Sequence, residues 1–335
     1  MASTQPNILI ITTDQQRFDS LSCYGSHFTS TPALDWLAEH GALFERAYCA
    51  NPVCTPARAS IFSGLYPSRH GAWNVGVNLS EDVELVSHRL GRAGYSTAYI
   101  GKAHFQAFDG NPGETLEPTR GWELLYPAFG GPYYGFEKVE LAFGHSSYGI
   151  GGHYGVWVND QVGSNKARSY SYPTNLSPID FGGNAFDWNI PLRLHNSVWT
   201  ADRTINYLES QEHAKPFLLA VGFEDPHHPH CVPLEFKNRV DPQEVPLPRY
   251  SEGELDDKPP HFLAAHTGQL EKSSFRGQFP IAGQGKGADF HGDQVRAQVV
   301  EEFPGPNLTP GIAVDRADED KAKIGAIFPH GVFPQ

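Results

Sequence analysis

One segment of the chain, residues 51–64, combines a cysteine, a proline and an arginine at a spacing that suits reaction with an anion. Proline disfavours helix at the residue before it, so Cys54 should lie on an extended turn while a helix begins at Ala57. The free N–H groups and dipole of that helix would favour an anion beside Cys54, and Arg58 adds a guanidinium suited to tetrahedral oxyanions. The segment predicts a nucleophile at a sulfate or phosphate site, although a buried structural cysteine beside a solvated arginine also fits these residues.

Further polar side chains follow two apolar runs that are typical of buried parallel strands. The run 7–13 ends at Asp14-Gln15, and the run 95–100 precedes Lys102 and His104, which are two residues apart and would share one face of an extended chain. Ligands gather at the carboxyl ends of parallel strands, so these side chains should lie together. The alternatives are a helix N-cap for the aspartate and surface positions for the other two residues. As a loop position, Asp14 is expected to tolerate alanine without loss of the fold.

A third apolar run, residues 216–223, is followed by a histidine-rich segment at 224–230. Three histidines close together suggest zinc, but His-His-Pro-His lacks the spacing of a known zinc site and no cysteine pair accompanies it. Because this segment also follows a buried strand, it should lie at the same edge of the sheet as Asp14 and Lys102.

Two of these segments resemble the signatures of the type I sulfatases, which belong to the alkaline-phosphatase-like superfamily. The first is Cys54-Thr-Pro-Ala-Arg58 followed by Ser63-Gly64, and the second is the segment from Gly94 to His104. The resemblance covers residues 5–250. It implies that a formylglycine-generating enzyme converts Cys54 to formylglycine, whose hydrated aldehyde supplies the hydroxyl that attacks sulfur in a small-molecule sulfate ester.

The resemblance also implies a role for each matching residue. Arg58 would stabilise the nonbridging oxygens of the substrate, and Lys102 the oxygens of formylglycine. His104 would take the proton that allows sulfate to leave. The histidine that helps to protonate the departing oxygen matches His227 best, with His228 as the alternative. The implied metal ligands are Asp14, Gln15 and residue 54. Oxygen ligands make Ca²⁺ the default ion, with Mn²⁺ or Mg²⁺ as alternatives.

Two positions depart from the sulfatase pattern. Gln15 stands where many sulfatases have a second aspartate; an Asp-Gln pair also occurs in the phosphonate monoester hydrolase and choline sulfatase branches of the superfamily. Hydrolysis of a phosphonate or phosphate diester therefore remains an alternative to sulfate ester hydrolysis. Ala103 replaces the usual bulky aromatic residue, which would widen the pocket.

The composition limits the class of protein. The chain has 335 residues, 39% of them apolar, which is enough for a large core, and a net charge of −13 argues against nucleic acid or an anionic membrane as partner. Four irregularly spaced cysteines without a Cys-x-x-Cys motif argue against a disulfide framework. The sequence shows neither a signal peptide nor an apolar membrane segment, so a cytoplasmic location is expected.

The order of predicted elements indicates an α/β fold, a doubly wound and mostly parallel sheet flanked by helices. Helices are predicted at residues 31–41, starting at a Thr31 cap, and at 85–94 and 197–208, with a short strand at 43–48. The segment 110–191 is rich in glycine and tyrosine without sustained periodicity, which predicts loop-rich insertions, including a solvated loop at 151–154.

The C-terminal segment, residues 251–335, is poorly patterned. The resemblance implies a Ser-Asp-His/Asn-Gly segment that carries two further metal ligands, yet only fragments of it occur, around Asp289, His291 and Asp293 and at 329–331. We therefore expect an incomplete C-terminal part, as in a truncation or a shifted reading frame. A third hypothesis follows, a catalytically impaired sulfatase-like fragment that only binds anions or partners.

Overall fold

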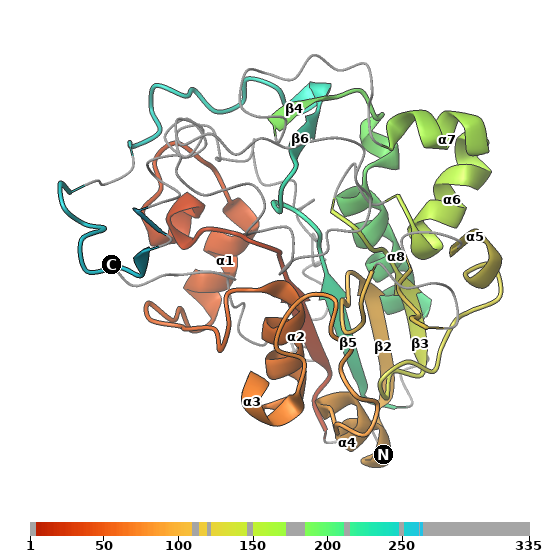
Figure 1. The fold of residues 1–335 in the computed structure, drawn as a ribbon. Coiled ribbons are helices and arrows are strands. Elements are labelled where there is room, and N and C mark those ends of the chain that lie inside the picture. Colours follow the sequence, from red (N-terminus) through yellow and green to blue (C-terminus); the bar gives the residue numbers. More distant parts are fainter. Residues whose placement is uncertain are drawn as a thin grey trace.

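A four-stranded parallel sheet forms the centre of the protein. The computed structural model describes residues 5–108, 114–118, 122–145, 150–171, 185–210, 215–247, 251–260 and 262–263. The strands lie in the order β1 (Ile8–Thr12), β5 (Phe217–Gly222), β2 (Ser96–Gly101) and β3 (Lys138–Leu141), and each pair of neighbours is parallel (Figure 1). The strands predicted at 7–13, 95–100 and 216–223 are confirmed.

Helices cover both faces of this sheet. Successive side chains of a strand point to opposite faces, and in β2 Tyr99 packs in a core with Phe62 of helix α2 (Cys54–Ser63). The next residue, Ile100, packs in a second core with Ala201 of helix α8 (Asn196–Ser210). The three layers confirm the doubly wound α/β fold, and they explain why the strands are continuously apolar.

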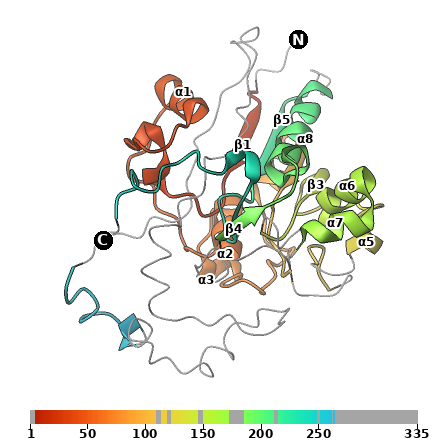
Figure 2. The same ribbon diagram turned by 90° about the horizontal axis from the view of Figure 1, so that it is seen from above.

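The remaining helices extend the two edges of the sheet. Helix α1 (Pro32–His40) lies beyond the β1 edge, and α5 (Trp122–Leu125), α6 (Gly152–Val162) and α7 (Ser164–Tyr170) lie beyond the β3 edge (Figure 2). The other elements are α3 (Pro67–His70), α4 (Val86–Arg92), a parallel pair of strands β4 (Ala185–Trp188) and β6 (His230–Pro233), and short 3-10 turns at Phe18–Ser20, Ser22–Tyr24, Leu192–Leu194 and Leu234–Phe236. None of the helices in the described ranges is long and apolar enough to cross a membrane.

The prediction of loop-rich insertions at 110–191 is wrong for much of that segment. It contributes β3 to the main sheet, and the described residues also form α5, α6, α7 and β4. Residues 151–154 are not a solvated loop but the start of α6, where Tyr154 is fully buried and donates its hydroxyl to the carbonyl of Leu194 at 2.7 Å. Periodicity missed these elements because most of them are four to seven residues long.

Three smaller expectations also differ from the structure. Residues 43–48 form no strand; no strand of the described part pairs with them, and Phe44 and Tyr48 are exposed. Pro32 begins α1 as predicted, but the Thr31 hydroxyl accepts the backbone N–H of Ser22 at 3.0 Å rather than capping the helix. The fragments at Asp289, His291, Asp293 and 329–331 lie outside the described residues.

Candidate active site

The carboxyl ends of the four central strands lie in one row. Thr12 pairs with Gly222, Gly222 with Gly101, and Gly101 with Leu141. Side chains that follow these residues therefore leave the sheet along a common edge, which is where open α/β sheets bind ligands. The same row brings together segments that are more than 200 residues apart in sequence, such as β1 and β5.

Close backbone approach at the ends of β2 and β5 sets the position of Lys102. Gly101 has φ +88°, and a Cβ at this residue would lie 2.1 Å from the carbonyl oxygen of Gly222. The same carbonyl accepts the N–H of Lys102 at 2.7 Å. Only glycine fits position 101 without displacing the neighbouring strand, and so this glycine turns the chain to bring the lysine over the end of the sheet.

Cys54 is the first residue of helix α2, not a residue outside it as the sequence suggested. The helix is Cys54–Ser63 with Val53 at the N-cap, and the N–H of Ala57 donates to the carbonyl of Val53 at 3.0 Å. Pro56 is tolerated there because the first-turn N–H groups lack intrahelical partners in any case. The thiol therefore lies in the first turn, at the positive end of the helix dipole.

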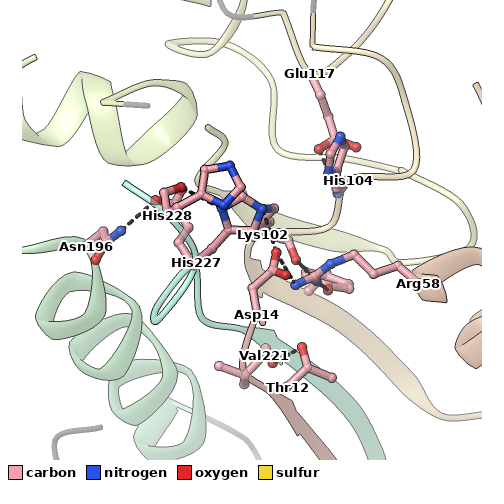
Figure 3. A network of polar contacts seen from close by, with 12 residues as sticks. Thr12, Asp14, Arg58, Lys102, His104, Glu117, Asn196, Val221, His227 and His228 are labelled. Atoms are coloured by element: carbon pink, nitrogen blue, oxygen red, sulfur yellow. Dashed lines mark hydrogen bonds and ion pairs between the residues drawn. The ribbon is translucent and has the colours of Figure 1, made fainter. Parts of the chain in front are cut away.

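Asp14, Arg58 and Lys102 form a buried ionic network beside the helix start (Figure 3). Oδ2 of Asp14 lies 2.6 Å from Nζ of Lys102 and 3.3 Å from Nη2 of Arg58, and all three side chains are buried. Nη1 of Arg58 also donates to the carbonyl of Lys102 at 2.5 Å. One carboxylate thus pairs with two buried cations, which places positive charge beside the start of α2. A bound oxyanion would balance it.

His104 lies at the same edge and is held from two sides. Its backbone is left-handed, with φ +53°, and its ring stacks on Phe108 with centroids 3.8 Å apart. The buried carboxylate of Glu117 accepts the backbone N–H groups of His104 (2.8 Å), Phe105 (2.8 Å) and Gln106 (3.2 Å). Burial, with the nearby Lys102 charge, lowers the pKa of His104 well below its usual value, so the ring is neutral at pH 7.

Two further histidines complete this edge. His145 follows β3 and stacks on His227, which follows β5, with ring centroids 3.8 Å apart. Burial, followed by the charge of Lys102, lowers the pKa of His227 to about 3. Nδ1–H of His227 donates to the carbonyl of His228 at 2.6 Å, which leaves Nε2 as the acceptor of the neutral ring. Cys54 Sγ and one ring nitrogen each of His104 and His145 lie within 4.8 Å of one another.

The structure thus gathers Asp14, Cys54, Arg58, Lys102, His104 and His227 at one edge of the sheet, as the sequence suggested, while their chemical roles stay predictions. Sequence analysis missed His145 and Glu117. A signal for His145 exists, because the segment 139–143, buried except at Glu140, is followed by Gly144-His145 much as β2 ends in Gly101 and is followed by Lys102. Glu117 carries no comparable signal in the sequence.

Asp14 and Gln15 offer the oxygen donors that a hard divalent cation prefers, but they supply only part of its coordination shell. Gln15 is exposed, with φ 60°, and its Oε1 accepts Nδ1–H of His228 at 3.1 Å. A carboxylate and an amide oxygen are ligands that Ca²⁺, Mn²⁺ or Mg²⁺ accept, yet Ca²⁺ takes about six to eight oxygens. Lys102 and Arg58 already share Oδ2 of Asp14.

Comparison with known proteins agrees with this geometry. The sequence model of the sulfatase family matches residues 6–248. The chain belongs to the sulfatase family. It is 30% identical over 258 residues to the uncharacterized sulfatase YidJ of Escherichia coli, covering 77% of this chain and 46% of that protein. It is 28% identical over 251 residues to an arylsulfatase of Clostridium perfringens, covering 73% and 48%.

Solved structures show the same fold for this sulfatase-family chain. The crystal structure of the phosphonate monoester hydrolase of Agrobacterium radiobacter superposes with a TM-score of 0.63 at 23% identity, covering 90% of this chain and 56% of that one. The putative sulfatase YidJ of Bacteroides fragilis gives a TM-score of 0.50 at 20% identity, covering 93% and 57%. The chain spans about half the length of the curated relatives it matches.

Proposed function

We propose that this chain carries the nucleophile half of a sulfuric ester hydrolase that uses formylglycine derived from Cys54 and a divalent metal. The observation that supports the proposal most directly is the buried Asp14–Arg58–Lys102 network beside the first turn of α2. Two cations against one carboxylate, next to the helix N-terminus, form a site for the oxygens of a sulfate group.

Modification of Cys54 is favoured over catalysis by its thiol. Burial is the largest cause that raises the pKa of Cys54, although the charges of Lys102 and Arg58 act in the opposite direction. A thiol with a raised pKa is a poor nucleophile at neutral pH, because the thiolate is the reactive form. Formylglycine at this position would supply, as its hydrate, the hydroxyl that attacks sulfur, and it requires a formylglycine-generating enzyme as partner.

The neighbouring side chains divide the remaining work. Arg58 and Lys102 would hold the sulfate oxygens by charge-assisted hydrogen bonds. His227 would donate a proton from Nε2 to the departing oxygen, so Nε2 must be protonated first. A bound anion would raise the pKa of His227 above the low value of about 3 in the site without an anion. His104 would accept the proton whose removal releases sulfate. Asp14 and Gln15 would hold the divalent cation, which supplies charge stabilisation to the substrate oxygens when bound.

A direct experiment combines peptide mass and turnover. The chain is co-expressed with a formylglycine-generating enzyme and its tryptic peptides are compared by mass; fragmentation of peptide 47–58, which carries both Cys49 and Cys54, locates the change. We expect a mass change only at Cys54, and hydrolysis of an aryl sulfate that is lost in Cys54→Ala and kept in Cys49→Ser. An unmodified Cys54 peptide from this host would refute the proposal, and so would equal activity of the wild type and Cys54→Ala.

Phosphonate or phosphate diester hydrolysis is the second candidate, and Gln15 is the residue that favours it. Assays of the same preparation on an aryl sulfate and a phosphonate monoester, compared as kcat/KM, decide between the two substrates. The third candidate, an impaired fragment, is favoured by the small number of oxygen ligands near Asp14 in the described residues. An impaired fragment would still be modified at Cys54, but it would bind the divalent metal weakly and would hydrolyse neither the aryl sulfate nor the phosphonate.

A further inference from the structure

The unmodified site contains a cluster of soft and borderline metal ligands. Sγ of Cys54 and one ring nitrogen each of His104 and His145 lie within 4.8 Å of one another, and no other group of three such residues occurs in the described part of the chain. The three ligands come from different elements, the start of α2 and the segments after β2 and β3. This cluster is therefore a product of the fold and not of a local sequence motif.

Two buried atoms of this cluster lack partners. Nδ1 of His104 and Nε2 of His145 are shielded from solvent, and neither has a hydrogen-bond partner among the described residues. A buried polar atom without a partner is costly, and most such atoms in folded proteins are paired. Coordination to a metal would satisfy a ring nitrogen in this position as well as a hydrogen bond does.

The surrounding contacts hold both rings in place. His104 stacks on Phe108, and Glu117 binds the backbone of its segment. His145 stacks on His227. Rings restrained in this way lose little conformational freedom on binding an ion, which favours a preformed site.

We propose that the chain with an unmodified Cys54 binds a zinc-type divalent ion through the Cys54 thiolate and the imidazoles of His104 and His145. On binding, the thiol releases its proton to solvent and a metal–sulfur bond forms. Thiolate and imidazole ligands select Zn²⁺ or Co²⁺ over Ca²⁺ and Mg²⁺, and three protein ligands leave the fourth tetrahedral position for water. Zinc bonds of roughly 2.0–2.3 Å place ligand atoms roughly 3.5 Å apart, so modest side-chain rotations close the site.

The neighbouring charges limit the affinity without excluding the ion. Lys102 and Arg58 oppose a second cation, whereas Asp14 neutralises one of them and the thiolate adds a negative charge. This site shares residue 54 with the implied oxygen-ligand site but uses His104 and His145 in place of Asp14 and Gln15. The proposal concerns only the chain with an intact thiol, and it stands whether or not the chain hydrolyses sulfate esters.

Cobalt provides a spectroscopic test. The chain is produced without a formylglycine-generating enzyme, its unmodified Cys54 is verified by mass, and Co²⁺ is titrated. We expect the thiolate-to-cobalt absorption band, and its loss on addition of Zn²⁺. Cys54→Ser should abolish the band. His104→Asn and His145→Asn should each weaken Co²⁺ binding by roughly tenfold or more. The control Cys49→Ser should change neither the band nor the affinity for Co²⁺. A band that persists in Cys54→Ser, or unchanged affinity in both histidine variants, would overturn the proposal.

A second measurement needs no variant and so does not depend on mutant folding. Zn²⁺ should slow the alkylation of Cys54 by iodoacetamide at least severalfold, while Cys49 of the same molecule reacts at an unchanged rate. Chelation of the zinc should restore the original rate. An alkylation rate of Cys54 that is the same with and without excess Zn²⁺ would also overturn the proposal.

Discussion

Nζ of Lys102, which follows β2, lies 2.6 Å from Oδ2 of Asp14, which follows β1, and both side chains are buried (Figure 3). The same oxygen accepts Nη2 of Arg58 at 3.3 Å. Asp14 is therefore the counter-ion of two buried cations and not simply a loop residue. This relationship changes what is expected of substitutions at the site, because removal of one partner leaves an uncompensated buried charge.

Asp14→Ala should destabilise the fold, contrary to the expectation from the sequence that a loop aspartate tolerates alanine. Loss of the carboxylate leaves Lys102 and Arg58 unpaired, and breaking a buried pair costs about 3–5 kcal/mol. Urea unfolding in the absence of divalent metal measures the effect. The matched control is Asp19→Ala, which removes an exposed ion pair with Arg17 and should cost less than about 1 kcal/mol. Equal stabilities of the two variants would contradict the counter-ion role.

Glu117→Gln should disturb His104 without touching the substrate. The amide keeps one acceptor oxygen but places N–H donors against backbone N–H groups, which should cost about 1–3 kcal/mol. If His104 acts in sulfate release, kcat should fall more than KM, and the exposed Glu123→Gln should change neither. Glu117 is a positioning residue, so its loss should change kcat. If the variant yields less folded protein but each folded molecule keeps a normal kcat, Glu117 only stabilises the fold and does not position His104.

Acid should destabilise the protein partly through His227. Burial, then the charge of Lys102, lowers the pKa of this ring from 6.5 to about 3 in the folded state. Between these values the unfolded chain binds the proton and the folded chain does not, so stability is full above pH 6.5 and declines as the pH falls towards 3. Urea unfolding at pH 7 and pH 5 should show a smaller decline for His227→Gln than for the wild type. The exposed His40→Gln should retain the full decline; an equal decline in all three proteins would refute the assignment.

Gln15→Asp should strengthen binding of a hard divalent cation. The change adds a carboxylate beside Asp14, and the affinity of oxygen sites rises with ligand charge, here by roughly tenfold. The left-handed backbone at this position, φ 60°, accepts aspartate. Calorimetric titration with Ca²⁺ measures the effect, with Gln15→Asn as the control that keeps the amide. No gain in Gln15→Asp would mean that residue 15 is not a ligand.

The main strands, their parallel arrangement and most of the site followed from local patterns. The apolar runs at 7–13, 95–100 and 216–223 are each long enough to mark a buried strand, and each is followed by a residue that the structure places at the site. This succeeds because parallel strands align their carboxyl ends, so a polar residue directly after a buried strand has one possible location. The spacing of Cys54 and Arg58 around Pro56 made them candidates, and the resemblance to the sulfatase signature decided in favour of a site.

The tertiary structure alone decided which other side chains surround the site residues that the sequence predicted. β3 is only four residues long, so the Gly144-His145 signal that follows it is weak, and the pairing of β3 with β2 is what brings His145 to the site. Glu117 reaches the backbone after β2 by long-range folding, and its binding of three N–H groups depends on contacts that no local pattern encodes. Local chemistry determined which residues can react, whereas burial and long-range pairing determined their charge states and neighbours.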